Sequence, residues 1–403
     1  MIRMHSNAGV GYSVVDLGGV PHVFASAVPR NGGSLEEQVL DALSTIKDLS
    51  EEQGTLGSIV MQAVFMQDIN DVAACREIID RFYGADLPAT SYIPQPPCGG
   101  KRVAIEALGV GRKRGGVQIE RFGENMVVTR HAGIAWMHVA DIWPQTPSPA
   151  TYDRSLDGFR QMRDRLASQG VKFEQVIRTW LYLGDIVGPE GDTQRYKELN
   201  RARTDFYADI PFGVGHKPQG WDKAFYPAST GIGTGGQDVT MSCIALLSDR
   251  PDVLCVPLEN PQQTAACEYA HQYGPQSPKF ARAMVVATGD AATTFVSGTA
   301  SITASETRHL DDLQGQTQQT WDNIEALIGE DNFRGHGLPG LGATLDDLAL
   351  VRVYIKREED YPVVRMNCET RLGEVPTIYA IGDVCRPELL VEIEGIAFSR
   401  RRG

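Results

Sequence analysis

Three apolar segments of the chain resemble one another and recur at similar intervals. Each is rich in the β-branched and aromatic residues that favour strands. The three segments are IVMQAVFM (59–66), VIRTWLYL (176–183) and LALVRVYI (348–355). Self-similarity along a chain is the sequence signature of an architecture built from repeated units. The chain is therefore predicted to contain three copies of one folding unit.

The same order of elements surrounds each of these strands. Segments with helical periodicity precede them, at 34–49, 152–170 and 313–329. In the first, Leu35, Val39, Leu43 and Ile46 share one helical face. Hairpin-like strands lie further upstream, at 22–29, 134–144 and 293–302. Downstream come a second helix and two strands, the first of which follows Pro88, Pro227 or Pro376. Each unit is therefore predicted to be β-β-α-β-α-β-β.

The repeats predict three domains, at 1–115, 116–255 and 256–403. The second domain contains extra residues at 205–226, whose Gly, Pro and aromatic content is typical of an ordered functional loop. The third begins with a linker, 256–283, that we expect to be a structured strap.

Composition excludes several classes of partner. The 403 residues are 42% hydrophobic, which is enough to build more than one core. The net charge of −13 disfavours nucleic acid and acidic membranes, because both attract clustered cations. Neither a signal peptide nor a membrane-spanning run is apparent. The 7 cysteines are scattered and never in CxxC spacing, which favours reduced thiols and a cytoplasmic location. We expect no nucleic-acid or membrane partner.

The order of the units, with the words VFMQD-x-x-D, LPATS and VEIEGIA, resembles the RidA (YjgF) superfamily. Its members are small α/β subunits that form trimers with a cleft at each subunit boundary. The resemblance implies an α+β chain in which three fused RidA-like repeats form a pseudo-trimer. Such a chain would be a monomer or a dimer.

A closer resemblance is to the chorismatase family, enzymes built on this fold that hydrolyse chorismate. The words that carry it are RTWLYLGDI (178–186), EGDTQRYKELNRAR (190–203), YPASTGIG (226–233), PLENPQQ (257–263), QYGPQSPKFARA (272–283), SGTAS (297–301) and CRPELLVEIEG (385–395). The resemblance implies cleavage of the enolpyruvyl ether of chorismate, without a metal or organic cofactor. The products would be pyruvate and a hydroxybenzoate or dihydroxycyclohexadiene carboxylate for secondary metabolism.

Two alternatives stay open, and the segment CEYAHQYGPQ around Tyr269, which has fewer arginines than the family pattern, favours the first of them. The first is a RidA-fold tailoring enzyme acting on another carboxylated or imine metabolite. The second is a ligand-binding RidA-like protein without catalytic activity.

The last strand, VEIEGIAF, carries Glu392 and Glu394 on one face, because side chains alternate along a strand. The resemblance places Glu392 at the catalytic carboxylate. The equivalent residues of the first two units are Ala104 and Thr240, so the third unit alone keeps the acid. Burial in a cleft would raise the pKa of Glu392, which suits a general acid. The alternative is a solvated strand face or an ion pair with Arg386.

Chorismate carries two carboxylates, so the resemblance also implies arginine anchors. We predict Arg371 and Arg203 for this role, with Arg365, Arg178 and Arg282 in reserve. Because most arginines lie at a protein surface, each is also a candidate for a purely surface position.

The remaining predicted substrate contacts are Tyr354, Tyr379, Tyr226, Thr230, Gly298, Glu394 and Cys385. The tyrosines lie in or beside strand ends, where a hydroxyl can reach a ligand, although a tyrosine there can equally belong to the core. Gly298 leaves room that a larger side chain would fill. No Cys–His context supports a nucleophilic role for Cys385, and no cluster of residues has metal-binding spacing.

Overall fold

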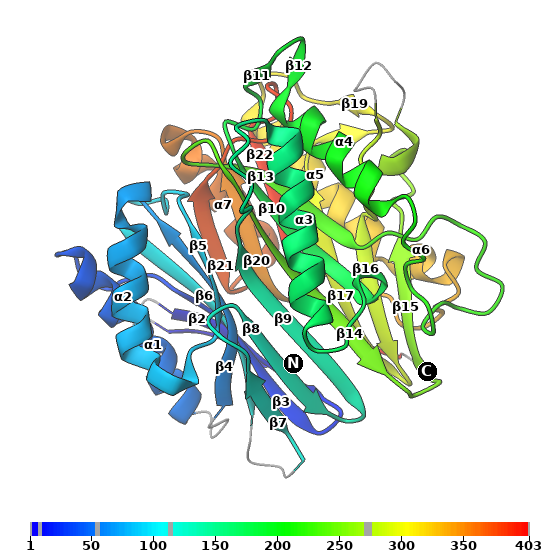
Figure 1. Cartoon of the computed structure of the whole chain (residues 1–403), viewed down its shortest axis with the longest axis horizontal. Coiled ribbons are helices and arrows are strands. Elements are labelled where there is room, and N and C mark those ends of the chain that lie inside the picture. Colours follow the sequence, from blue (N-terminus) through cyan, green and yellow to red (C-terminus); the bar gives the residue numbers. More distant parts are fainter. Residues whose placement is uncertain (1, 7–9, 53–56, 112–115, 270–275, 402–403) are drawn as a thin grey trace.

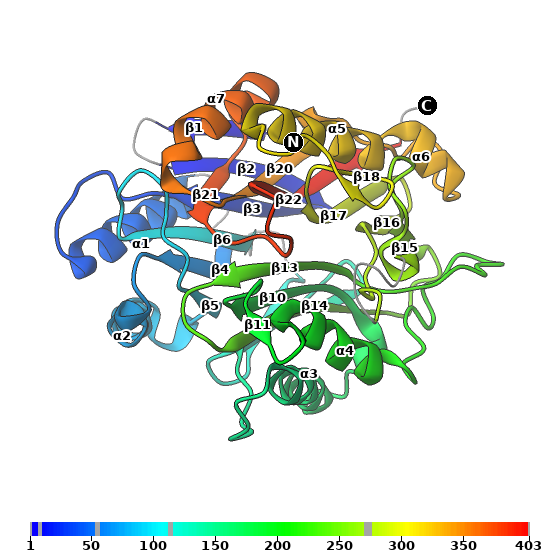
Figure 2. The same cartoon turned by 90° about the horizontal axis from the view of Figure 1, so that it is seen from above.

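Three six-stranded mixed sheets form the centre of the protein (Figure 1). The computed structural model describes residues 2–6, 10–52, 57–111, 116–269 and 276–401. In the view of Figure 2, the sheets lie at the centre and the long helices lie outside them. No helix within these residues is long and apolar enough to cross a membrane.

The first sheet has the strand order β1-β2-β3-β6-β4-β5. Its strands are β1 (Ile2–Ser6), β2 (Val10–Leu17), β3 (Val20–Ala27), β4 (Gly57–Met66), β5 (Ala89–Ile93) and β6 (Val103–Gly111). Helices α1 (Leu35–Glu52) and α2 (Val72–Tyr83) pack against it. The predicted apolar face of α1 is confirmed, because Val39, Leu43 and Ile46 are all buried.

The second sheet has the order β7-β8-β9-β14-β10-β13. Its strands are β7 (Gln118–Arg121), β8 (Met126–His131), β9 (Ile134–Ile142), β10 (Val176–Gly184), β13 (Ala228–Thr234) and β14 (Val239–Ser248). Its helices are α3 (Thr151–Ala167) and α4 (Arg195–Tyr207). A small hairpin of β11 (Pro189–Glu190) and β12 (Thr193–Gln194) precedes α4.

The third sheet has the order β15-β16-β17-β22-β20-β21. Its strands are β15 (Val253–Leu258), β16 (Ala283–Thr288), β17 (Ala291–Thr299), β20 (Leu348–Ile355), β21 (Thr377–Ile381) and β22 (Val391–Arg400). The helices of this unit are α5 (Leu313–Ile328), α6 (Glu330–Gly335) and α7 (Tyr361–Leu372). Strands β18 (Ile302–Thr303) and β19 (Glu306–Thr307) form a separate hairpin. Short 3₁₀ helices lie at Ile69–Asp71, Gly84–Asp86, Phe173–Gln175, Ala266–Glu268, Leu345–Asp347 and Glu358–Asp360.

The three units share one strand order, so the threefold repeat predicted from the sequence is confirmed. The predicted unit was nevertheless one strand short, because β1, β7 and β15 each add a first strand at the sheet edge. The sequence of β7, QIER, is short and polar, and β15 lies at the start of the segment predicted to be a strap. The limits of the three predicted domains stay a prediction.

Equivalent positions of the three sheets carry different residues. Strands β4, β10 and β20 pair with β6, β14 and β22 in the same register. One set of paired residues is Ala63–Glu106, Trp180–Ser242 and Arg352–Glu394. The scaffold is therefore repeated three times, whereas the side chains on it are not.

Candidate active site

A cavity of about 500 Å³ lies between the second and third units. The second unit contributes residues from the hairpin β11–β12, from α4 and from β13, among them Asp192, Tyr196, Asn200, Arg203, Ser229 and Gly231. The third unit contributes Phe280, Arg282, Gly298, Ala300, Cys385, Arg386, Glu388 and Glu392. The cavity is therefore at a boundary between units, as the resemblance to RidA-type trimers implied.

Glu392 points into this cavity from β22, where it pairs with Tyr354 of β20. The residue is only 4% exposed. Burial and, next, the negative charge of Glu394 raise the pKa of Glu392 to about 8, although Arg178 and Arg282 act in the opposite direction. At neutral pH the carboxyl group is therefore mainly protonated and able to donate a proton.

Gly298 on β17 makes room for this carboxyl group. A Cβ atom at residue 298 would lie 2.1 Å from Oε1 of Glu392. The register between β17 and β22 shifts at this point, between Val296 and Thr299. The backbone N–H of Gly298 donates to Oγ1 of Thr230 at 2.9 Å, which ties the shifted backbone to β13. The space that the sequence predicted at Gly298 is thus filled by the acid itself.

The other two units lack this acid at the same position. The register pairs Phe65 with Ala104 in the first unit and Tyr182 with Thr240 in the second, as it pairs Tyr354 with Glu392 in the third. The predicted equivalence of residues 104, 240 and 392 therefore holds in the structure.

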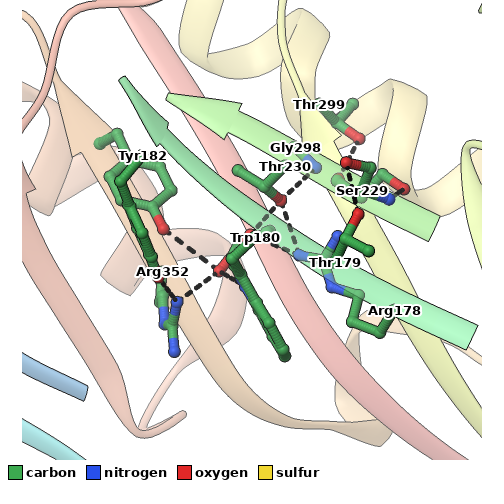
Figure 3. Close-up of polar contacts among 12 residues, drawn as sticks. Arg178, Thr179, Trp180, Tyr182, Ser229, Thr230, Gly298, Thr299 and Arg352 are labelled. Carbon is green, nitrogen blue, oxygen red and sulfur yellow. Dashed lines mark hydrogen bonds and ion pairs between the residues drawn. The ribbon is translucent and has the colours of Figure 1, made fainter. Parts of the chain in front are cut away.

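Glu394, two residues further along β22, lies in a buried hydrogen-bond network. It accepts from Trp180 Nε1 at 2.9 Å and from Tyr354 OH at 3.2 Å. Arg178 Nη2 lies 2.5 Å from one of its oxygens, and Arg352 Nη1 lies 3.1 Å from the other. Figure 3 shows Arg178 and Arg352 in this network, with Thr230 and Gly298 beside it.

The environment of Glu394 keeps it ionised. Its pKa is lowered because, although burial acts to raise it, Arg178 and Arg352 together outweigh that effect. At neutral pH, Glu392 is therefore mainly neutral, whereas Glu394 is negatively charged. Glu394 does not line the cavity, and its contacts give it a structural position.

Two buried arginines line the cavity, and neither has an ion-pair partner among the residues that the structure describes. Arg203 of α4 donates to Ser229 Oγ at 3.4 Å and also bonds the side-chain oxygen of Asn200. Arg282 donates to Tyr269 OH at 2.5 Å and to the Thr264 carbonyl at 3.2 Å. No carboxylate of a described residue lies within ion-pair distance of either guanidinium. Both cations are therefore available to an anionic ligand.

Phe280 packs between these two cations, with its ring centroid 5.4 Å from the guanidinium carbon of each. Arg282 also interacts electrostatically with the carboxyl group of Glu259, but burial raises the pKa of Glu259 to about 7. Its negative charge is thus only partial at neutral pH. The cavity wall combines an apolar ring with positive charge, which suits a ring-shaped carboxylate.

The predicted site residues divide into three groups. Those that line the cavity are Glu392, Arg203, Gly298 and Cys385, together with the reserve Arg282. Those that lie behind its wall, within the buried network, are Thr230, Tyr354, Glu394 and the reserve Arg178. Those placed elsewhere are Tyr226, Tyr379, Arg371 and the reserve Arg365.

Arg371 is a correction to the predicted anchors. It lies near the end of α7, partly exposed, and pairs with Asp322 and Glu325 at 2.7 Å each. Tyr379 packs edge-on against Tyr361, at a centroid distance of 5.4 Å, on the far side of the third unit's sheet. The fold directs these two side chains to α5 and α7 instead of the cavity.

Tyr226 lies outside the cavity, whereas Cys385 lines it. Tyr226 stacks on Tyr207, with centroids 6.2 Å apart, as part of the aromatic core of the second unit. Cys385 lines the cavity, and burial raises the pKa of its thiol to about 12, so the thiol is neutral. The arginine-poor stretch noted in the sequence falls largely on residues 270–275, which lie outside the described residues.

Sequence reasoning missed Tyr196 and Asn200, which line the cavity from α4 beside Arg203. The signal was present, because residues spaced i, i+4 and i+7 share one face of a helix. Within the described ranges, no group of three or more His, Cys, Asp or Glu side chains is arranged to hold a metal ion.

The chain is similar in sequence to three enzymes of Streptomyces. It is 34% identical over 230 residues to a 3-hydroxybenzoate synthase of Streptomyces hygroscopicus, covering 56% of this chain and 64% of the relative. It is 32% identical over 276 residues to a chorismatase of Streptomyces rapamycinicus, covering 66% of this chain and 77% of the relative. No family model matches the chain.

Solved structures show the same fold. A chorismatase crystal structure superposes with a TM-score of 0.66 and 22% identity, covering 96% of this chain and 99% of the other. A YjgF-family protein of Neisseria meningitidis matches 32% of this chain and 92% of its own length, with a TM-score of 0.24 and 18% identity. The predicted α+β fold of three RidA-like units is confirmed. With its fold and two thirds of its sequence matched, the chain belongs to the chorismatase family.

Proposed function

We propose that this protein hydrolyses the enolpyruvyl ether of chorismate and releases pyruvate. One observation carries the proposal: a buried, protonated carboxyl, Glu392, shares a cavity with two guanidiniums, Arg203 and Arg282, that have no ion-pair partner among the described residues. Chorismate is a ring that carries two carboxylates and an acid-labile enol ether. The cavity offers a counterpart for each of these features.

The chemistry follows from the proton on Glu392. Transfer of that proton to the methylene carbon of the enolpyruvyl group leaves a cation stabilised by the ether oxygen. Water adds to this cation and returns a proton to the carboxylate of Glu392. The resulting hemiketal collapses to pyruvate and a ring alcohol, so one water is consumed for each pyruvate released. Arg203 and Arg282 would bind the carboxylates and hold the ether beside the acid.

The ring product is either a dihydroxycyclohexadiene carboxylate or, after loss of water, a hydroxybenzoate. One similar protein is a 3-hydroxybenzoate synthase, which makes the hydroxybenzoate the first product to test. Either acid could serve secondary metabolism as a starter unit. Chromatography of the reaction mixture against both acids distinguishes the two outcomes.

Coupling pyruvate release to lactate dehydrogenase tests the proposal. The wild-type protein should release pyruvate from chorismate, and Glu392→Gln should lower kcat by about 100-fold or more. Glu369→Gln, an exposed change on α7, is the matched control and should retain full activity. Absence of pyruvate with the wild type would overturn the proposed substrate. Full activity of Glu392→Gln would overturn the role of the acid.

A further inference from the structure

Arg352 joins all three units at the centre of the protein. Its guanidinium binds both carboxylate oxygens of Glu106 in the first unit, at 2.6 Å each. The same group donates to Tyr182 OH of the second unit at 3.0 Å and contacts Glu394 of its own unit at 3.1 Å. Arg352 thus links Glu106 of the first unit to Glu394 on strand β22 of the third unit.

A second set of contacts continues from Glu394 towards the cavity. Arg178 binds Glu394 and also donates to Thr230 Oγ1 at 2.6 Å. Thr230 bonds Glu394 as well and accepts the backbone N–H of Gly298 at 2.9 Å. A Cβ atom at residue 298 would overlap the carboxyl group of Glu392, so the contacts that start at Glu106 end at backbone lying against the acid.

The four charged residues of this network balance one another. Glu106 and Glu394 supply two negative charges, and Arg178 and Arg352 supply two positive charges. All four are buried, with relative exposures of 9%, 3%, 2% and 6% respectively. In such a poorly solvated region a change of one unit charge acts over a longer distance than it would in water. The charge on Glu392 is therefore sensitive to the balance of the set.

Other groups also face Glu392 from the elements around it. Glu394 lies on its own strand, Arg282 lines the cavity, and Arg178 lies behind the cavity wall. Tyr196 of α4, Arg203 of α4 and Cys385 complete the titratable or charged neighbours on the cavity side, and Tyr354 pairs with Glu392 on β20. Burial raises the pKa of Tyr196 and Cys385, so neither carries charge near neutral pH. Among these neighbours, Glu394 is the one that favours the neutral form of Glu392 by its charge.

We propose that Glu106, Arg352, Glu394 and Arg178 form a charge relay that holds Glu392 in place as a neutral acid. Glu106 is then a positioning residue, supplied by the first unit for a cavity that the other two units form. The proposal rests on the function proposed above, in which Glu392 donates the proton. It gives the first unit, whose own acid position is Ala104, an indirect part in the chemistry through Arg352.

The test uses variants that change the net charge of the relay in opposite directions. Glu106→Gln leaves one positive charge in excess, so the alkaline limb of kcat/KM should move down by about one pH unit. Arg352→Gln leaves one negative charge in excess, so the limb should move up. The double variant restores neutrality, and its limb should return towards that of the wild type. Tyr182→Phe removes a bond to Arg352 without a charge, and it should leave the limb in place.

A readout that needs no activity separates this proposal from the proposed function. Glutamate labelled with carbon-13 at the side-chain carboxyl reports the ionisation of Glu392 by NMR, with Glu392→Gln identifying its signal. The midpoint should move in the same opposite directions in Glu106→Gln and Arg352→Gln. These shifts without pyruvate release would overturn the proposed substrate and leave the relay standing. Equal midpoints in folded variants, or shifts of the same sign, would overturn the relay.

Discussion

Gly298 and Glu392 occupy space that only one side chain can fill, because a Cβ atom at residue 298 would approach Oε1 of Glu392 to 2.1 Å. Gly298→Ala should therefore displace the carboxyl and lower kcat by about tenfold or more. The obstructed atom is the end of a flexible side chain, so the melting temperature should change little. Gly32→Ala is the control, since a Cβ there meets no atom within 4 Å. Unchanged kcat in Gly298→Ala would contradict the observed contact.

The two arginines of the cavity should differ from the arginine on α7. Arg203→Gln and Arg282→Gln each remove a cation that faces the ligand, so KM for chorismate should rise by about tenfold or more. Arg371→Gln removes a charge that already pairs with Asp322 and Glu325, so its kinetics should match those of the wild type. Steady-state kinetics of the three variants provide the comparison. A rise in KM for Arg371→Gln alone would restore the anchor first predicted from the sequence.

The activity should decline on the alkaline side. Glu392 donates a proton only in its neutral form, and burial raises its pKa to about 8. The value of kcat/KM should be level below this pH and fall about tenfold per pH unit above it. A pH profile of pyruvate release, with the coupling enzyme in excess, measures this limb. A limb near pH 4.5, the ordinary value for glutamic acid, would show that the cavity does not perturb the group.

The same pKa predicts a pH-dependent difference in stability. Between about pH 4.5 and 8, Glu392 is ionised in the unfolded chain but protonated in the folded one, so raising the pH favours unfolding. The wild type should lose up to about 1.4 kcal/mol per pH unit in this window relative to Glu392→Gln. Urea unfolding of both proteins at several pH values measures the difference. A constant difference would indicate that the carboxyl has an ordinary pKa in the folded state.

Glu394 should matter to stability far more than a surface acid. Glu394→Gln leaves Arg178 and Arg352 buried without one of their counter-ions, and the free energy of unfolding should fall by about 3 kcal/mol. Glu369→Gln disrupts an exposed pair with Arg365 and should cost less than about 0.5 kcal/mol. Chemical denaturation measures both values. Equal losses would mean that the buried pairs add nothing beyond those at the surface.

The sequence was informative wherever a feature recurred within the chain. Three similar apolar segments and the helical segments before them predicted the strands β4, β10 and β20 and the helices α1, α3 and α5. Comparison of Ala104, Thr240 and Glu392 likewise singled out the acid, because the fold forms at that position without it. The edge strand β7 was not predicted, because its four largely polar residues give no periodic apolar signal.

Site residues that depend on packing between units were harder to predict. Arg371 and Arg282 both lie near family words, yet only the arrangement of the units shows that Arg282 faces the cavity and Arg371 faces α5. The charge state of Glu394 could not be predicted from the sequence either, because its partners Arg178 and Trp180 lie in a different unit. Sequence spacing reports which residues share a face, but it does not report what lies opposite that face.

The different residues at matching positions of the three sheets have an evolutionary consequence. In a trimer of identical subunits, the positions held here by Glu106, Ser242 and Glu394 would carry the same residue, as would those of Ala63, Trp180 and Arg352. A carboxylate at one of these positions would then require a carboxylate at all three, and the same holds for a guanidinium. Covalent fusion removes that restriction, since each copy can mutate alone. Each copy could therefore acquire a charge that the others lack, and here Glu106 of the first unit and Arg178 of the second pair with Arg352 and Glu394 of the third.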